Sequence, residues 1–171
     1  MKLHSFLLLC AALPLAAAAS DALPTAPPAG TQLAFTLAAR GVQIYECRDR
    51  AWVLVAPEAT LQDAQGRVVG IHGAGPTWQL ADGSRVRGSV QARVDAPGGR
   101  DIPWLLLTAH AEPSAQGSLT GISHIQRLNT RGGLAPAGAC VNQQSARVPY
   151  TADYLFFRSA GQSAAASSAA G

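Results

Sequence analysis

The chain has 171 residues, with 13 Lys and Arg against 10 Asp and Glu, and a formal net charge of +3 at pH 7. This length suits a single domain core. The weak and scattered positive charge disfavours electrostatic binding of nucleic acid, so we expect no nucleic-acid partner.

The first twenty residues, MKLHSFLLLCAALPLAAAAS, have the pattern of a secretory signal peptide: a basic start at Lys2, an apolar run and small residues before the cleavage region. We therefore expect export to the periplasm or the extracellular space. Lys2 is the only lysine, so cleavage leaves 13 − 1 = 12 Arg against 10 acidic residues, a net charge of +2. No later stretch approaches the roughly 18 apolar residues that a spanning helix needs, so we expect no integral membrane segment after cleavage.

The mature chain divides into three parts by composition. Residues 21–30, DALPTAPPAG, predict an extended lead-in without a core face. Residues 31–158 predict one domain. Residues 159–171 contain a low-complexity Gly, Ser and Ala tail that has nothing to bury.

Within the domain the hydrophobic pattern is typical of β-structure. Residues 85–95 alternate between an apolar face and a polar, solvent-exposed face that includes Arg93. The apolar face consists of Val86, Gly88, Val90, Ala92 and Val94. The Asp82-Gly83 turn before them predicts a hairpin with residues 77–80. Further strands are expected at 32–38, 41–47, 51–55, 67–72, 103–110, 119–128 and 153–158.

Two of these strands raise separate questions. The continuous apolar run PWLLLTA, residues 103–109, predicts a strand buried on both faces. Residues 119–128 repeat apolar positions every three residues, as a helix would, but Gly121 and the β-branched content favour a strand. Many short strands with frequent turns predict an all-β fold, either an antiparallel β-sandwich or a small barrel.

The glycines of RVVGIHGAGPTWQL, residues 67–80, suggest a nucleotide-binding loop, but their order is wrong. Trp78 stands where a dinucleotide fingerprint needs its third glycine, and a hairpin follows instead of a helix. No Gly-Lys-Ser/Thr follows either, which excludes a P-loop. We expect a tight turn between two strands and no cofactor.

Cys47 and Cys140 remain once Cys10 leaves with the signal peptide, and an even pair in an exported chain predicts one disulfide. The alternative is two separate buried thiols. A bridge would close a loop of 140 − 47 = 93 residues, which the chain-entropy model values at roughly 4 to 5 kcal/mol.

The residues offer no catalytic signature of a known hydrolase. There is no G-x-S-x-G and no H-E-x-x-H. The histidines of the mature chain, His72, His110 and His124, are far apart in sequence. Histidines on strands can converge on a metal, but a single histidine on a strand is more often structural, so we expect no metal site.

The remaining candidates for a ligand site are aromatic and polar. An indole offers a stacking face for sugars or peptides, and Trp78 lies beside the glycine turn. With His72 it forms the first candidate pair. Side chains of the closing strands complete the set: Arg127, Tyr150 and Asp153.

Two functions are compatible with this set. The first is a non-catalytic exported domain that binds a cell-wall or extracellular glycan or a small molecule, or that serves the cell envelope. It predicts an exposed aromatic side chain beside residues 73–76. The alternative is a secreted enzyme with a pocket centred on His72, which requires an accessible His72 within hydrogen-bond reach of an acidic or hydroxyl partner.

Five blocks of the sequence carry a family resemblance. They are GVQIYECR, VGIHGAGPTWQL, IPWLLL, IQRLNTRGGLAPAGAC and VPYTADYLFF, in that order. Together they resemble the secreted bacterial and fungal family catalogued as domain of unknown function 3455, over about residues 30–158. The family has no established activity. The resemblance implies the disulfide, because both cysteines fall in matched blocks.

Overall fold

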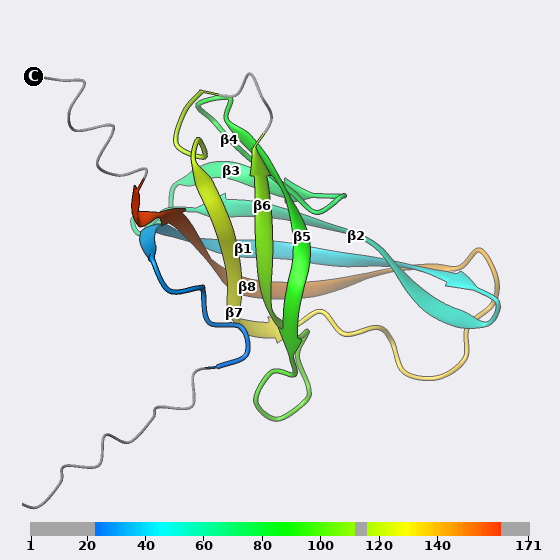
Figure 1. The fold of residues 1–171 in the computed structure, drawn as a ribbon. Helices are drawn as coiled ribbons and strands as arrows, with labels where there is room; N and C mark the ends of the chain where they lie inside the picture. The colour runs from blue at the N-terminus through cyan, green and yellow to red at the C-terminus, as the bar shows by residue number, and fades with distance from the viewer. Residues whose placement is uncertain (1–22, 112–115, 162–171) are drawn as a thin grey trace, which may run out of the picture.

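The computed structural model describes residues 23–111 and 116–161. It shows eight antiparallel strands that pair in chain order and close into a barrel through β1 and β8 (Figure 1). The strands are β1 (Thr31–Arg48), β2 (Ala51–Gln62), β3 (Val68–Gly73), β4 (Thr77–Leu80), β5 (Arg85–Val94), β6 (Trp104–Ala111), β7 (Ile122–Gly132) and β8 (Ser145–Ser159). The prediction of an all-β antiparallel fold is confirmed, with the barrel as the form it takes.

The glycine-rich stretch is a turn between strands. Residues 74–76 connect β3 to β4, and the Asp82-Gly83 turn connects β4 to β5. Gly83 has a φ of +84°, a conformation that favours glycine. The segment with helical periodicity is a turn followed by β7, so the strand prediction is confirmed there.

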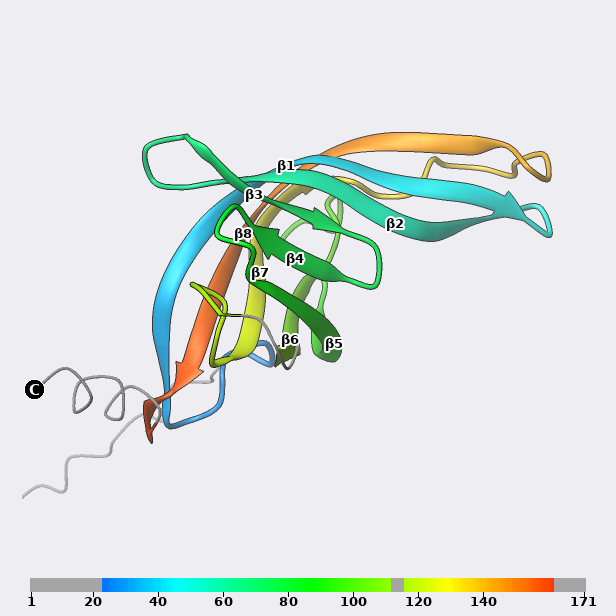
Figure 2. The ribbon, with the colours of Figure 1, turned by 90° about the horizontal axis from the view of Figure 1, so that it is seen from above.

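β1 is one strand of 18 residues, where the sequence predicted two separated near Gly41. A Cβ at Gly41 would overlap the backbone of Glu58 and Ala59 on β2, so this position needs glycine. β1 therefore passes close to β2 at Gly41, and the whole strand is long and curved (Figure 2).

Three strands extend beyond the barrel. β3 pairs with β2 only from Ala59 onward, and β7 pairs with β8 only from Tyr150 onward. Residues 41–48 of β1, 51–57 of β2 and 145–149 of β8 therefore form a three-stranded projection, called the arm below, with the loop 133–144 beside it (Figures 1 and 2).

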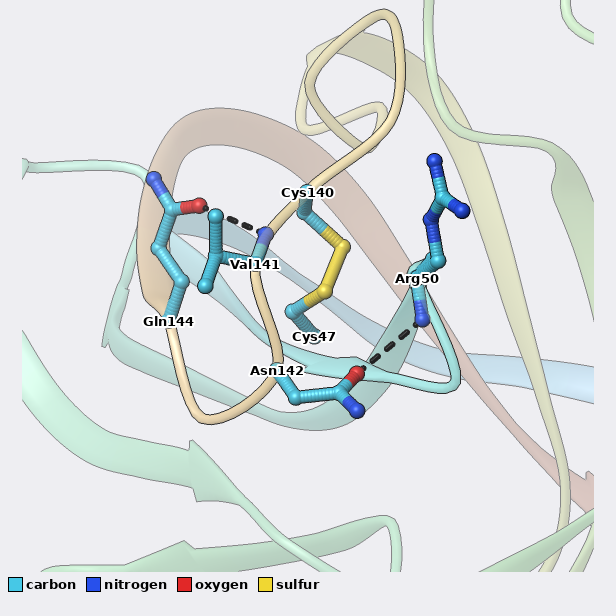
Figure 3. The surroundings of a disulfide bond; sticks show 6 residues. All are labelled: Cys47, Arg50, Cys140, Val141, Asn142 and Gln144. Carbon is cyan, nitrogen blue, oxygen red and sulfur yellow. Dashed lines mark hydrogen bonds between the residues drawn. A yellow bond between two sulfur atoms is a disulfide. The ribbon is translucent and has the colours of Figure 1, made fainter.

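The disulfide between Cys47 and Cys140 is present, as predicted, and it fastens the loop 133–144 to the arm (Figure 3). The backbone supports the same attachment, because Cys47 N donates to Gln144 O at 2.8 Å and Gln143 N donates to Cys47 O at 3.0 Å. Arg50 N also donates to Asn142 Oδ1 at 3.0 Å. The loop is thus held at one end of the arm by both covalent and hydrogen bonds.

The opposite end of the barrel is filled by apolar side chains. Leu61, Val86, Ile125 and Phe156 are fully buried there, and Leu119 joins them from the turn before β7. We call this the packed end.

Hydrogen bonds fix the turn that carries Leu119 to the β4–β5 turn. The Asp82 carboxylate accepts hydrogen bonds from Ser84 N (2.9 Å) and Ser118 N (2.7 Å), and Leu119 N donates to Ser84 Oγ at 3.2 Å. The hydrogen bond from the Ser84 hydroxyl is the main cause that holds the pKa of Asp82 well below its ordinary value.

The N-terminal segment covers the outer face of β7. Thr25 is fully buried, and its carbonyl accepts a hydrogen bond from Gln126 Nε2 at 2.6 Å. The lead-in therefore contacts the barrel at Thr25, on the outer face of β7, and Thr25 is not part of the apolar core cluster. Leu106, which pairs with Gln126 on the same face, is buried like the inward-facing Leu107, so the prediction of a strand buried on both faces holds at these two residues.

The predicted signal peptide, residues 1–20, and residues 162–171 of the predicted tail lie outside the described residues. Within 23–111 and 116–161, no helix is long and apolar enough to cross a membrane.

Candidate ligand-binding cavity

A cavity of about 640 Å³ lies at the arm end of the barrel. Strands, the arm and the loop 133–144 all contribute to its wall. The lining residues are Gln43, Tyr45, Trp52, Leu54, Val55, Ala56, Pro57, His72, Gly75, Pro76, Trp78, Val90, Arg93, Ile102, Pro103, Leu105, Leu107, Arg127, Leu134, Ala135 and Tyr154.

The strand register brings His72 and Trp78 to the inner face. His72 pairs with Trp78 across β3 and β4, and side chains directly opposite each other share a face of the sheet. Gly88 on β5 makes room for the indole, because a Cβ there would lie 2.8 Å from the Trp78 ring. The position of Trp78 therefore depends on glycine at 88.

His72 is neutral and held in one orientation. Its Nδ1–H donates to Thr77 O at 2.8 Å, which leaves Nε2 as an acceptor. The ring stacks on Trp78 at 4.4 Å and meets Tyr154 edge-on at 4.9 Å. Burial lowers the pKa of His72 to about 4, and the nearby charge of Arg127 acts in the same direction.

Arg127 brings a positive charge into the cavity from β7. It pairs with Leu105 on β6 and with Tyr154 on β8. Its Nε and Nη2 donate to Pro103 O at 3.1 Å and 2.8 Å. Among the described residues, no carboxylate forms an ion pair with it, and none of the residues that line the cavity is Asp or Glu.

Several buried polar atoms in and beside the cavity wall have no hydrogen-bond partner of standard geometry. They are Gln43 Nε2, Trp78 Nε1 and the hydroxyls of Tyr150 and Tyr154. A buried polar group left unsatisfied costs about 1 to 3 kcal/mol. Such groups in a native structure often mark the position of a missing partner.

The two tyrosines stay protonated at physiological pH. Burial raises the pKa of Tyr150 and that of Tyr154, although the positive charge of Arg127 opposes the shift at both. Their hydroxyls also interact with each other. Both tyrosines therefore remain neutral hydrogen-bond donors.

A family model described as protein of unknown function (DUF3455) matches residues 28–158. The chain belongs to the DUF3455 family. No curated protein and no solved structure matches it. The matched range includes every residue that lines the cavity.

In this DUF3455 barrel the predicted site residues do not all lie together. His72, Trp78 and Arg127 line the cavity. Tyr150 is buried in the barrel interior, where its hydroxyl faces that of Tyr154, but it does not line the cavity. Asp153 lies on the outer face, where it accepts a hydrogen bond from Asn129 Nδ2 at 2.8 Å.

The sequence analysis missed Gln43, Tyr45, Arg93 and Tyr154. The alternation of GVQIYEC places Gln43 and Tyr45 on the same face of the strand, so both could have been found from the sequence. Tyr154 follows Asp153 on a strand and therefore points to the opposite face, toward the interior. Arg93 was expected on the polar, solvent-exposed face of β5. A β-bulge between Val90 and Ala92 shifts the register, so Arg93 pairs with Leu105 and lines the cavity.

Trp78 is not the exposed aromatic that the binding hypothesis predicted, because only 1% of its surface is accessible. Its indole forms part of the inner wall. Among the aromatic residues that line the cavity, Trp52 on the arm is the partly exposed one.

The alternative hypothesis, an enzyme with a pocket centred on His72, requires an accessible His72 with an acidic or hydroxyl partner, and in this DUF3455 cavity His72 is 3% exposed. The hydrogen-bond partner of His72 is a backbone carbonyl, and within the described residues no acidic or hydroxyl side chain bonds to it. The same residues contain no group of three or more His, Cys, Asp or Glu placed to hold a metal ion.

Proposed function

We propose that this DUF3455 protein is a non-catalytic binding protein that holds one small organic molecule in the barrel cavity. The observation that carries the proposal is a set of buried donors that lack a hydrogen-bond partner of standard geometry, Gln43 Nε2, Trp78 Nε1 and Tyr154 OH, on the wall of a cavity of about 640 Å³. Ligand pockets usually enclose roughly 300 to 1,000 Å³. Eight-stranded barrels leave an interior wide enough for one small ligand.

A small molecule fits this cavity better than a polymer. Trp78 and Tyr154 are almost fully buried inside the barrel, so they do not form a surface platform on which a long glycan could lie. The exposed lining residues Leu54, Val90 and Leu134 place the mouth of the cavity on the side of the arm, where a ligand would enter. We therefore favour a small molecule over a cell-wall glycan as the partner.

We further propose that the protein works outside the cytoplasm, in the periplasm or the extracellular space. The predicted signal peptide supports this location. The Cys47–Cys140 disulfide is compatible with it, because structural disulfides persist in oxidising compartments.

Binding can be tested with N-phenyl-1-naphthylamine, a neutral probe that fluoresces in apolar sites. We expect saturable binding at one site per chain. Leu105→Trp, which adds volume on the cavity wall, should weaken probe binding at least tenfold. Thr108→Trp, on the outer face of the same strand, is the matched control and should bind as the parent does.

Circular dichroism and thermal melting of both variants should show that the barrel is folded. Absence of saturable probe binding to the parent chain would overturn the proposal. Equal binding by the parent and the folded Leu105→Trp variant would also overturn it, because the probe would then lie elsewhere.

A further inference from the structure

We infer that the ligand of the cavity is an anionic amphiphile: a molecule with a carboxylate head that binds Arg127 inside the barrel and an apolar body that extends toward the arm. This inference rests on the proposed binding function and specifies the class of molecule. Three independent features of the cavity support it: its charge, its spare hydrogen-bond donors and the position of its apolar residues.

The charge of the cavity is positive and uncompensated. Arg127 and Arg93 lie on either side of Leu105 on adjacent strands, and both line the cavity. None of the lining residues is acidic. His72 is neutral at physiological pH because of its burial. An anion would supply the missing counter-charge, whereas a cation would be repelled.

Arg127 keeps donors available for such an anion. Of the five N–H groups of a guanidinium, Pro103 O accepts one from Nε and one from Nη2. The Tyr154 hydroxyl also interacts with the guanidinium, which leaves two of the five N–H groups to offer at the edge formed by Nη1 and Nη2. A carboxylate binds such an edge with two parallel hydrogen bonds.

The neutral side chains near this charge are also mostly donors. Gln43 Nε2 and Trp78 Nε1 can only donate, and the Tyr154 hydroxyl can donate as well. All three residues are at most 2% exposed. Gln43 Nε2 and Trp78 Nε1 have no hydrogen-bond partner among the described residues, and the Tyr154 hydroxyl interacts with Tyr150 and Arg127 without standard hydrogen-bond geometry. A carboxylate supplies acceptor lone pairs on two oxygens, which is what this set of donors lacks.

The apolar part of the lining lies farther out. Leu54, Val90 and Leu134 line the cavity, although 51%, 57% and 40% of their surfaces are accessible. Trp52 lies beside them on the arm. Apart from the exposed Arg93, the wall thus changes from buried polar groups to exposed apolar ones, so the head of the ligand should lie inside near Arg127 and its body at the mouth.

The inference can be tested with three compounds that share one tail: decanoate, 1-decanol and decyltrimethylammonium. Each is titrated at pH 7.5, below its micelle concentration, to displace N-phenyl-1-naphthylamine from the parent protein. We expect decanoate to bind at least tenfold more tightly than decanol, and decyltrimethylammonium to bind more weakly than decanol. This ranking requires no variant.

Arg127→Gln should lower decanoate affinity at least tenfold and change decanol affinity less than twofold. Arg67→Gln is the matched control, because the Arg67 side chain is 75% exposed and pairs with Asp63 outside the cavity. It should leave both affinities unchanged. Since Arg127 also binds Pro103 O, Arg93→Gln provides a second variant, with an expected loss of two- to fivefold for decanoate.

The outcomes separate the inference from the proposed function. If decanol or the ammonium compound binds as tightly as decanoate, the cavity binds ligands but does not select anions, and only the inference is overturned. The same holds if folded Arg127→Gln keeps the preference for decanoate. If neither the probe nor any of the three compounds binds, both the inference and the proposed function are overturned.

Discussion

The two ends of this barrel differ in the polarity of their interior, and the change occurs within two residues along a strand. On β8, Phe156 is fully buried in the packed end, and Tyr154 lines the cavity with a hydroxyl that has no hydrogen-bond partner of standard geometry. On β7, Ile125 and Arg127 repeat the same change from apolar to polar. Both pairs face the barrel interior. The packed end stabilises the fold, and the cavity end keeps polar groups that the fold itself does not satisfy.

The largest expected effect lies at the packed end. Phe156→Ala should lower the free energy of unfolding by about 3 to 5 kcal/mol, because it removes a buried ring and leaves a void. The ring stacks on Phe35 with a centroid distance of 4.8 Å and meets Trp78 at 6.4 Å. Urea denaturation of the variant and the parent measures the difference.

A loss below about 1 kcal/mol for Phe156→Ala would contradict this division of the barrel. It would mean that the packed end contributes no more to stability than an ordinary surface position.

An intermediate effect should appear at the cavity end as a dependence of stability on pH. Folding lowers the pKa of His72 to about 4, from 6.5 in the unfolded chain. Between these values the unfolded chain binds a proton that the folded chain does not bind. The contribution of neutral His72 to the free energy of unfolding is therefore fully present above about pH 6.5. It is lost as the pH falls toward 4, by at most about 1.4 kcal/mol per pH unit.

Urea denaturation between pH 4 and pH 7 tests this expectation. His72→Gln should show a flatter dependence than the parent. His124→Gln is the control: burial also lowers the pKa of His124, but that side chain is only partly buried on the outer face, so its removal should change the slope less. Equal slopes for the parent and His72→Gln would contradict a buried neutral histidine.

The sequence predicts the fold well where a strand is regular. The alternation of residues 85–90, the Asp82-Gly83 turn and the cysteine pair all lead to features that the structure contains. It fails where a strand continues through a residue that usually ends one. Gly41 lies inside β1, and Pro149 lies inside β8, which begins eight residues earlier than the predicted 153–158. Pairing with neighbouring strands overrides the local preference there.

The candidate site is predictable only in part, because a shift of one residue on a strand reverses the direction of its side chain. Asp153 was chosen for its charge, but Tyr154 faces the cavity. Arg93 enters the wall through a β-bulge, which alternation alone does not reveal. His72, Trp78 and Arg127 were found through their chemistry, while the lack of a standard hydrogen-bond partner at Gln43 Nε2 and Tyr154 OH is visible only in three dimensions.

The smallest expected change in stability gives the sharpest test of the cavity end. Tyr154→Phe removes a buried hydroxyl that has no hydrogen-bond partner of standard geometry, so the free energy of unfolding should stay the same or rise by up to about 1 kcal/mol. Tyr45→Phe makes the same chemical change on the same wall, but the Tyr45 hydroxyl donates to Gly133 O at 2.6 Å. Its loss should lower stability by about 1 kcal/mol. If urea denaturation shows that both variants lose the same free energy of unfolding, the Tyr154 hydroxyl already forms a stabilising hydrogen bond within the fold and is not available to a ligand.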